Sequence, residues 1–316
     1  LPVVDKVAIR PAPPQPVARG RQCVRDLLAG LGAVESITHS LISEEAATPF
    51  LPPGCTALRV EDERARAEPI LRPSVVPSLL RVRRHNQDAG VAKLSLFEIA
   101  SVFHVKPDGA HHEHESLAIV ADHDQPELEL RPLRGVIERL VELLVGRAAK
   151  VAVSAPEEGE GMGWLGAQGV ITLDGTAIGR LGLVRRSVQD AFGLDRAVVA
   201  AEITLQSLLA LYPPQVTAGS LPAFPAIERD LSVLVPEEVN WKAVQSSVEG
   251  LGLPHLEAVE FVTVFRGKHV PSGSKSLTLR LRFRAGERTL RAEEVDPSVA
   301  ATVGCLGSRF GAQVRS

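Results

Sequence analysis

The sequence predicts an α+β protein built in two parts, and three observations support this fold class. Several stretches alternate apolar and polar residues, which is typical of half-buried strands. Other stretches place apolar residues at three- and four-residue steps, as amphipathic helices do. A proline-rich break from Tyr212 to Pro225 divides the chain, with strand and helix patterns on both sides of it. We therefore expect two domains, each with its own core.

The first part shows a regular series of element signals. Four prolines within residues 11–16 predict that residues 1–16 form an extended linker. A helix is expected over 17–31, where glycines end its apolar pattern, and a later helix is opened by Pro77. The pair Asp174-Gly175 predicts a hairpin over 169–184, because a tight turn there needs positive φ angles. The domain spans 17–215, with further strands over 34–42, 94–105, 116–122 and 197–205 and helices over 133–144 and 207–212.

The last part, residues 222–316, has a compact order of elements. Strands are predicted over 229–235, 256–267, 275–284 and 312–315, and helices over 240–251 and 293–310. The resulting order, β-α-β-β-α-β, is that of a ferredoxin-like domain. Such a domain packs its helices on one face of an antiparallel sheet and leaves the other face open.

Strand alternation predicts which side chains the open face carries. Leu277, Leu279, Leu281 and Phe283 share the core face, so Ser276, Thr278, Arg280, Arg282 and Arg284 share the other. The three arginines stand roughly 6.6 Å apart, comparable with phosphate spacing. In the preceding strand, Val262 and Val264 are assigned to the core, which leaves Phe261, Thr263 and Phe265 on the open side. Exposed aromatics beside arginines suit the recognition of single-stranded RNA.

The charges are unevenly placed although the net charge is only −3. The stretch from Arg266 to Arg291 holds eight Lys or Arg and a single acid, Glu287, as a nucleic-acid contact surface would. The candidate phosphate contacts are Arg266, Lys268, Lys275, Arg280, Arg282 and Arg284. Two alternatives stay open: a solvated charged strand, or a face that another domain covers and in which the phenylalanines are core.

Composition and motifs exclude other classes of protein. A chain of 316 residues with 45% hydrophobic and 23% charged content is neither disordered nor collagen-like. No run of about 18 uncharged apolar residues occurs, and LPVVDKVAIR shows no secretion signal, so we expect a cytoplasmic protein. Its only methionine is Met162, which indicates a piece cut from a longer polypeptide. No P-loop, GxGxxG or GxSxG pattern supports an independent nucleotide enzyme or a hydrolase.

The sequence gives little support to a metal site. The cysteines, Cys23, Cys55 and Cys305, lack metal or disulfide spacing, so we expect reduced, buried thiols. A cluster of histidines and glutamates over 111–115 contains metal-binding residue types. It follows a Pro-Asp-Gly segment, so we expect a solvated turn there and no bound metal. Glu157, Glu158 and Glu160 are expected to form a flexible acidic loop.

Three blocks near the C-terminus resemble the ferredoxin-fold anticodon-binding domain of the bacterial-type phenylalanyl-tRNA synthetase beta subunit: FPAIERDLSVLV (224–235), FVTVFRGKHVPSGSKSLTLRLRFR (261–284) and RTLRAEEV (288–295). Upstream blocks are similar to the class II synthetase-like module of the same family: ILRPSVVPSLLRVRRHN (70–86), LFEIASVF (96–103) and DGTAIGRLGLV (174–184). The resemblance covers residues from about 17 to 316, with residues 1–16 as the tail of a preceding domain.

The resemblance implies a role in a ligase that attaches phenylalanine to its tRNA. The family works as an alpha2-beta2 tetramer that uses ATP and magnesium, and its active site lies in the alpha subunit. The implied partners are the alpha subunit and tRNA(Phe), with neither DNA nor membrane. No cofactor is expected on this segment. The alternative is a stand-alone RNA-binding or regulatory protein built from the same modules.

No catalytic residue is expected in this chain. A catalytic module of this class carries Phe-Arg-x-Glu, whose arginine holds the ATP phosphate. The corresponding stretch here is Phe103, His104, Val105 and Lys106, with neither the arginine nor the carboxylate. No GxGxGxER sequence follows, and GMGWLGAQG (161–169) stands where the family has a His-Pro-Gly-Arg segment. The resemblance therefore implies a non-catalytic scaffold that packs against the catalytic subunit.

The resemblance also implies a set of anticodon contacts. The family holds the first anticodon base with an Asp-x-Tyr pair, whose positions fall on Thr263 and Phe265. Phe265 can still stack on a base, whereas Thr263 lacks the carboxylate acceptor, so any hydrogen bond to a guanine edge is weaker or comes from another residue. The remaining family contacts fall on Ser232, Ser276 and Arg315, and Arg291 replaces the usual helix-capping threonine.

Overall fold

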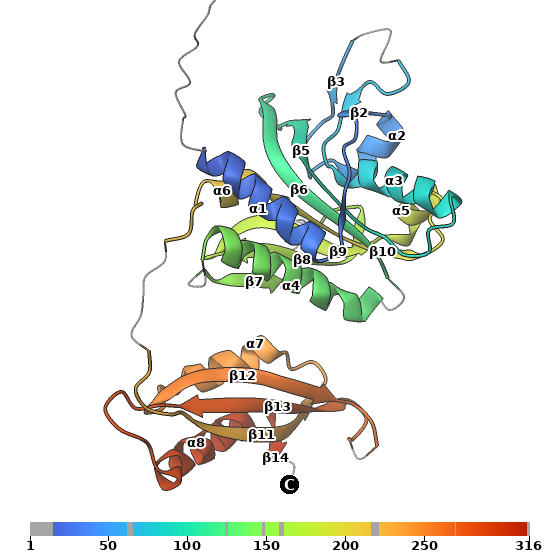
Figure 1. Ribbon diagram of the computed structural model, residues 1–316. Coiled ribbons are helices and arrows are strands. Elements are labelled where there is room, and N and C mark those ends of the chain that lie inside the picture. The colour runs from blue at the N-terminus through green and yellow to red at the C-terminus, as the bar shows by residue number, and fades with distance from the viewer. Residues whose placement is uncertain are drawn as a thin grey trace, which may run out of the picture. The chain divides into compact units, whose positions relative to one another are not determined.

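A computed structural model describes residues 15–61, 66–123, 126–146, 149–157, 161–215, 221–268 and 270–314 (Figure 1). The chain divides into two compact units, residues 1–217 and 218–316, and the division falls within the proline-rich break. Of the linker expected over 1–16, only Gln15 and Pro16 belong to the described residues. No helix in the described ranges is long and apolar enough to cross a membrane.

The first unit is built on a seven-stranded sheet with the strand order β1-β5-β6-β10-β9-β8-β7. All neighbouring strands are antiparallel except β1 and β5, which run parallel. The strands are β1 Val34–Glu35, β5 Ser95–Val105, β6 His111–His123, β7 Val151–Ser154, β8 Leu165–Leu173, β9 Thr176–Val184 and β10 Ala197–Thr204. A small sheet of order β2-β4-β3 is formed by β2 Leu41–Ile42, β3 Leu58–Arg59 and β4 Ile70–Leu71.

Helices cover both faces of the large sheet because strand alternation makes both faces apolar. One core joins Phe97, Leu181 and Ile203 to the helices α1 Pro16–Gly30, α4 Pro126–Leu144 and α6 Leu205–Leu209. Figure 1 shows α1 and α4 beside each other over this sheet. The opposite core, around Leu96 and Trp164, is closed by α3 Val76–Asp88, α5 Arg186–Ala191 and the 3-10 turn η1 Thr48–Phe50. The short helix α2 Glu44–Ala47 packs in a separate small core with β2 and β4.

Local chemistry explains the confirmed elements of this unit. Pro77 stands in the first turn of α3, where its missing N–H costs no hydrogen bond. Asp174 and Gly175 have φ angles of 47° and 86°, so they close the predicted hairpin between β8 and β9. At Gly179 a Cβ would lie 2.3 Å from the carbonyl oxygen of Glu202, so β9 and β10 approach too closely there for a side chain.

Two expectations for this unit, and one for the cysteines of both units, are wrong. The strand expected over 34–42 is two short strands, β1 and β2, which lie in different sheets. Between them the backbone N–H and the hydroxyl of Thr38 donate to the Glu98 carboxylate at 3.1 and 2.7 Å, which fixes the course of the chain. The histidines of 111–114 are in strand β6, not in a solvated turn. The three free cysteines are half-buried, not buried. Glu158 and Glu160 lie outside the described residues.

The second unit confirms the β-α-β-β-α-β order. Its sheet has the order β12-β13-β11-β14, and all its pairings are antiparallel. The elements are β11 Ile227–Pro236, α7 Trp241–Glu249, β12 Leu256–Phe265, β13 Ser274–Phe283, α8 Ala292–Phe310 and β14 Gln313–Val314. The core lies between one sheet face, with Val233 and Leu279, and the two helices, with Val244 and Leu306. Asn240 caps α7 by accepting from the backbone N–H of Ala243 at 2.9 Å.

Candidate nucleic-acid interface

The open face of the second unit is the sheet surface turned away from its core. Along β13 the core residues alternate with residues of the open face, because successive side chains of a strand point to opposite sides. Thr278 stands opposite both Ser232 of β11 and Thr263 of β12 in the strand register. Two residues before Thr278 in β13, Ser276 stands opposite Phe265 of β12.

These residues form one polar patch, which we name the hydroxyl patch: Ser232, Thr263, Phe265, Ser276 and Thr278. The hydroxyl oxygens of Ser232 and Thr278 are 2.8 Å apart and share a hydrogen bond. Phe265 is 46% exposed, whereas Ser276 is only 4% exposed. The structure thus brings together four of the five residues expected to contact the anticodon. The fifth, Arg315, lies outside the described residues.

Gly267 fixes the place of the Phe265 ring. A Cβ at position 267 would lie 2.8 Å from the ring atom Cζ of Phe265, closer than real Cβ contacts. The ring therefore packs against the backbone at Gly267, and a larger residue there would push it aside. This contact holds an exposed aromatic ring at the end of the hydroxyl patch.

A β-bulge corrects the sequence interpretation of Phe261. The register between β12 and β13 shifts between Phe261 and Thr263, because Val262 is an extra residue without a partner. Phe261 therefore stands opposite the core residue Leu279, and its ring makes an edge contact with Trp241 at a centroid distance of 5.6 Å. The expectation that Phe261 shares the open face with Thr263 and Phe265 is wrong, because alternation fails across the bulge.

The rest of the open face is a lattice of opposite charges, which we name the charged lattice: Glu228, Asp230, Glu260, Arg280 and Arg282. Arg280 donates to both oxygens of Asp230 at 2.7 and 2.9 Å and lies 3.1 Å from Glu228. Arg282 lies 3.1 Å from Glu228 and 3.2 Å from Glu260. Hydrogen bonding from Arg280 lowers the pKa of Asp230 below its ordinary value. Arg280 and Arg282 are therefore neutralised by acids of the neighbouring strands.

The other predicted phosphate contacts are also partnered, with one exception. Arg266 makes a two-oxygen contact with Glu237, whose backbone carbonyl accepts from Lys275 at 2.6 Å. Arg284 donates to Glu257 at 3.2 Å and to the carbonyl of Phe224 at 2.6 Å. Within the described part of the chain, Lys268 alone among the six candidates forms no ion pair, and it is exposed.

Sequence reasoning placed Thr278 on the open face but not among the anticodon contacts, and it missed the acids of the charged lattice. The signal was present, since Glu228, Asp230 and Ser232 alternate with core residues in the same way as the arginines of β13. Only the strand register shows that these acids face the arginines. The start of α8 is another such case: the Glu294 carboxylate accepts from the backbone N–H of Arg291 at 2.7 Å, which satisfies one donor at this helix end. Hydrogen bonds from Arg288 and that N–H lower the pKa of Glu294 to about 2.

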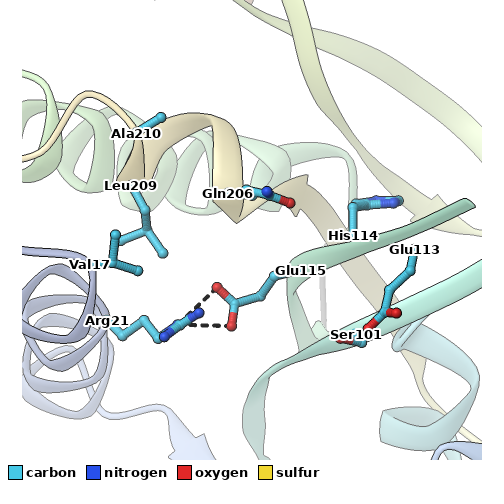
Figure 2. A pocket seen from close by; sticks show the side chains of 9 residues that line it. All are labelled: Val17, Arg21, Ser101, Glu113, His114, Glu115, Gln206, Leu209 and Ala210. Atoms are coloured by element: carbon cyan, nitrogen blue, oxygen red, sulfur yellow. Dashed lines mark hydrogen bonds and ion pairs between the residues drawn. The ribbon is translucent and has the colours of Figure 1, made fainter.

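The first unit provides a hollow of about 550 Å³ between α1, α6 and the strands β5 and β6. Figure 2 shows Arg21 of α1 pointing toward Glu115 of β6 across it, and their charged atoms are 2.8 Å apart. Because this guanidinium already has its carboxylate, the hollow offers an incoming anion no free charge. Gln206 and Leu209 of α6 complete the wall.

The end of β5 carries Phe103, His104 and Val105, which stand where a catalytic module has its Phe-Arg-x-Glu sequence. His104 stands opposite His112 in the β5–β6 register, and the ring centroids of the two are 4.8 Å apart. Burial, helped by His112 and His104, lowers the pKa of His114 to about 4, and burial also lowers that of His104. Both imidazoles are therefore neutral at neutral pH. Among the described residues, no group of three or more metal-binding side chains is placed to hold an ion.

Comparison with known proteins agrees with this architecture. Residues 2–205 match the family model of the phenylalanyl tRNA synthetase beta chain CLM domain, and residues 222–315 match the ferredoxin-fold anticodon binding domain. Both matches follow the order of the two units.

Related proteins match over nearly the whole chain. The phenylalanine–tRNA ligase beta subunit of Geobacillus kaustophilus is 29% identical, over 100% of this chain and 40% of its own length. Those of Symbiobacterium thermophilum and Vibrio vulnificus are 30% and 29% identical, over 92% of this chain and 34% and 37% of their own lengths. The chain thus spans between a third and two fifths of the relatives it matches. With a family model covering most of its residues, the chain belongs to the phenylalanyl-tRNA synthetase beta chain family.

Proposed function

We propose that this chain is the C-terminal part of a phenylalanine–tRNA ligase beta subunit. Its first unit supports the catalytic alpha subunit of an alpha2-beta2 enzyme, and its second unit binds the tRNA(Phe) anticodon through the hydroxyl patch. The observation that carries the proposal is the pair of family matches, in order, over 2–205 and 222–315. In this proposal ATP and magnesium serve the whole cytoplasmic enzyme and are not bound by this chain.

The hydroxyl patch suits an unstacked base. Phe265 offers a half-exposed ring for stacking, and the neighbouring hydroxyls of Thr263, Ser232 and Thr278 can donate to or accept from base edges. Ser276 is almost fully buried opposite Phe265, so its role in this proposal is to support the ring. The patch carries no ion pair of its own, so a base can enter without displacing a carboxylate.

Phosphate contacts are best assigned outside the charged lattice. Arg280 and Arg282 would have to exchange their carboxylate partners for phosphates, and such an exchange gains little. Lys268 follows Phe265 by three residues and is exposed, so it is the candidate whose charge an RNA backbone can use most fully. Arg266 and Lys275 come next, because they share the single partner Glu237.

The edge of the large sheet supports a protein partner. Leu31, Val34 and Ile37 lie just before, in and just after strand β1, and they are 56%, 53% and 93% exposed. Since β1 is an edge strand, both its backbone and these apolar side chains are available for docking. We assign this edge to the alpha subunit.

A binding experiment with two transcripts tests the anticodon role. The chain is titrated with tRNA(Phe) and with the same tRNA whose first anticodon base is changed, at one fixed salt concentration. The proposal predicts that the cognate transcript binds at least about fivefold more tightly, since one specific base contact contributes ~1–3 kcal/mol. Equal affinities would contradict anticodon recognition.

Co-expression with an alpha-type subunit from the same genome tests the scaffold role. We expect a stable complex, and a double substitution, Val34→Lys with Ile37→Lys, should weaken it without unfolding the chain. Arg59→Glu, on the small sheet, serves as the surface control. A chain that stays a partner-free monomer in the presence of the alpha subunit would instead support the stand-alone RNA-binding protein.

A further inference from the structure

A second cavity, of about 260 Å³, lies on the sheet face of the first unit opposite α1 and α4. Four neighbouring strands each contribute a polar residue to its floor: His104 from β5, His114 from β6, Glu202 from β10 and Arg180 from β9. Phe50 and Trp164 form an aromatic wall, with ring centroids 5.3 Å apart. The combination of an apolar wall and a few converging polar groups is typical of a small-molecule site.

Four polar atoms of this cavity are buried without a hydrogen-bond partner in the described structure: His104 Nδ1, His114 Nδ1, Trp164 Nε1 and one terminal nitrogen of Arg180. Trp164 is 1% exposed and His104 is 8% exposed, so bulk water does not reach them freely. Buried polar groups without partners cost free energy, and such a concentration at one cavity indicates a missing occupant.

Arg180 is the most informative of these residues. It stands opposite Glu202 in the β9–β10 register, yet no ion pair joins it to any described residue. The buried arginines elsewhere in this unit differ: Arg72 pairs with Glu98 at 3.0 Å and Arg83 with Asp122 at 2.7 Å. In the hollow of Figure 2, Arg21 likewise pairs with Glu115. A half-buried guanidinium that lacks a carboxylate calls for an anion from outside the chain.

Glu202 does not supply that charge because the chain itself uses its carboxylate. The backbone N–H of Val75 donates to Glu202 at 2.8 Å, and the hydroxyl of Ser74 also donates to it. Burial raises the pKa of Glu202, so its environment opposes a full negative charge. The cavity therefore has donors to spare and no free carboxylate to hold an ammonium group.

We propose that this cavity binds a small organic carboxylate with a compact apolar body. The carboxylate accepts from Arg180 and from the indole N–H of Trp164, two groups that can only donate. The apolar body packs against Phe50, Met162 and Val102. The volume equals that of about nine water molecules at ~30 Å³ each, which suits a single ring with a short side arm.

Calorimetric titration of the whole chain with three matched ligands tests the chemistry. The probes are 3-phenylpropanoate, its uncharged amide, and phenylalanine, which adds an ammonium group to the same body. We expect 3-phenylpropanoate to bind one per chain and at least tenfold more tightly than either of the others. Equal binding of the amide would overturn the anion assignment. Tighter binding of phenylalanine would overturn the argument from Glu202.

Inorganic phosphate is the fourth probe, because it carries charge without an apolar body. The proposal predicts weaker binding of phosphate than of 3-phenylpropanoate. Equal or tighter binding would show that the aromatic wall contributes nothing, and the organic ligand class would then be wrong.

Two variants connect binding to the cavity. Arg180→Met keeps the length of the side chain and removes its charge, and Trp164→Phe keeps a ring and removes the N–H. We expect at least a tenfold loss of 3-phenylpropanoate affinity for Arg180→Met and a three- to tenfold loss for Trp164→Phe. Arg186→Met, at an exposed arginine of α5, is the matched control and should bind as the unmodified chain does. Unchanged affinity in Arg180→Met would overturn the proposal.

Thermal unfolding without ligand separates a binding role from a structural one. An unpartnered guanidinium destabilises the empty cavity, so Arg180→Met should melt at the same or a higher temperature than the unmodified chain. A marked fall in melting temperature would show that Arg180 supports the fold and would contradict the assignment. The ligand itself should raise the melting temperature of the unmodified chain and of Arg186→Met but not of Arg180→Met.

Discussion

Phe261 and Phe265 differ in their surroundings although they are close in the same strand. They stand four residues apart in β12 and are 42% and 46% exposed, so neither composition nor exposure separates them. The bulge at Val262 does: Phe261 packs against Trp241 on the helix side, and Phe265 stands beside Ser276 on the open side. One unpaired residue thus decides which ring can meet an RNA base.

The largest expected effect on stability is at Phe261. Phe261→Ala removes the edge contact with Trp241 and part of the apolar surface that covers the core, so we expect a loss of ~1–2 kcal/mol in the free energy of unfolding, less than a fully buried Phe would cost. Urea titration followed by circular dichroism measures it. Phe265→Ala, the matched substitution, should change the midpoint less, and a larger loss at Phe265 would contradict the face assignment.

Introducing a carboxylate into the hydroxyl patch should increase the preference for guanine at the first anticodon position. In Thr263→Asp the new carboxylate can accept from the Watson–Crick edge of a guanine, a charge-assisted contact that is stronger than one to a hydroxyl. We expect up to about tenfold tighter binding of a transcript with guanine at the first anticodon position, and no gain for one with adenine there. Equal gains or losses for both transcripts would show that position 263 does not face that base.

The salt dependence of tRNA binding should separate Lys268 from the charged lattice. Lys268→Gln removes a cation that pairs with no described residue, so the slope of log affinity against log salt should become shallower by roughly 0.7–0.9. Arg280→Gln should change that slope much less, because Arg280 is already neutralised by Asp230 and Glu228. A larger change at Arg280 would mean that phosphates displace these carboxylates.

Acid should weaken the charged lattice before it affects the hydroxyl patch, which has no titratable group. The pKa of Asp230 is lowered in the folded chain by its hydrogen bond from Arg280. Its stabilising contribution is therefore complete above its ordinary pKa of about 4 and is lost as the pH falls through the lower, folded value. Urea midpoints measured between pH 6 and pH 2.5 should fall less steeply in Asp230→Asn. Identical slopes would show that the pair does not contribute.

The sequence was sufficient wherever a local rule held without interruption. All six elements of the second unit, the hairpin at Asp174-Gly175 and the helix opened at Pro77 follow from alternation, turn chemistry and proline geometry. The core face of β13 follows from strict alternation in the same way.

Other features depend on contacts between segments that are distant in sequence. The bulge at Val262 is invisible to alternation, and the acids that neutralise Arg280 and Arg282 lie about 20 or about 50 residues before them in the chain. The course of the chain between β1 and β2 depends on hydrogen bonds from Thr38 to Glu98, a carboxylate 60 residues away. The Pro-Asp-Gly segment predicts a loop that includes the histidines after it. The turn is shorter than this, and β6 already begins at His111.

The affinity of Phe265→Ala for tRNA(Phe), measured beside that of Phe261→Ala at one salt concentration, tests the central claim most directly. Loss of a stacked base costs ~1–3 kcal/mol, so Phe265→Ala should bind about five- to 150-fold more weakly than the unmodified chain. Phe261→Ala, measured under conditions where it remains folded, should bind normally. Unchanged affinity in Phe265→Ala, or an equal loss in both variants, would contradict anticodon binding by the open face.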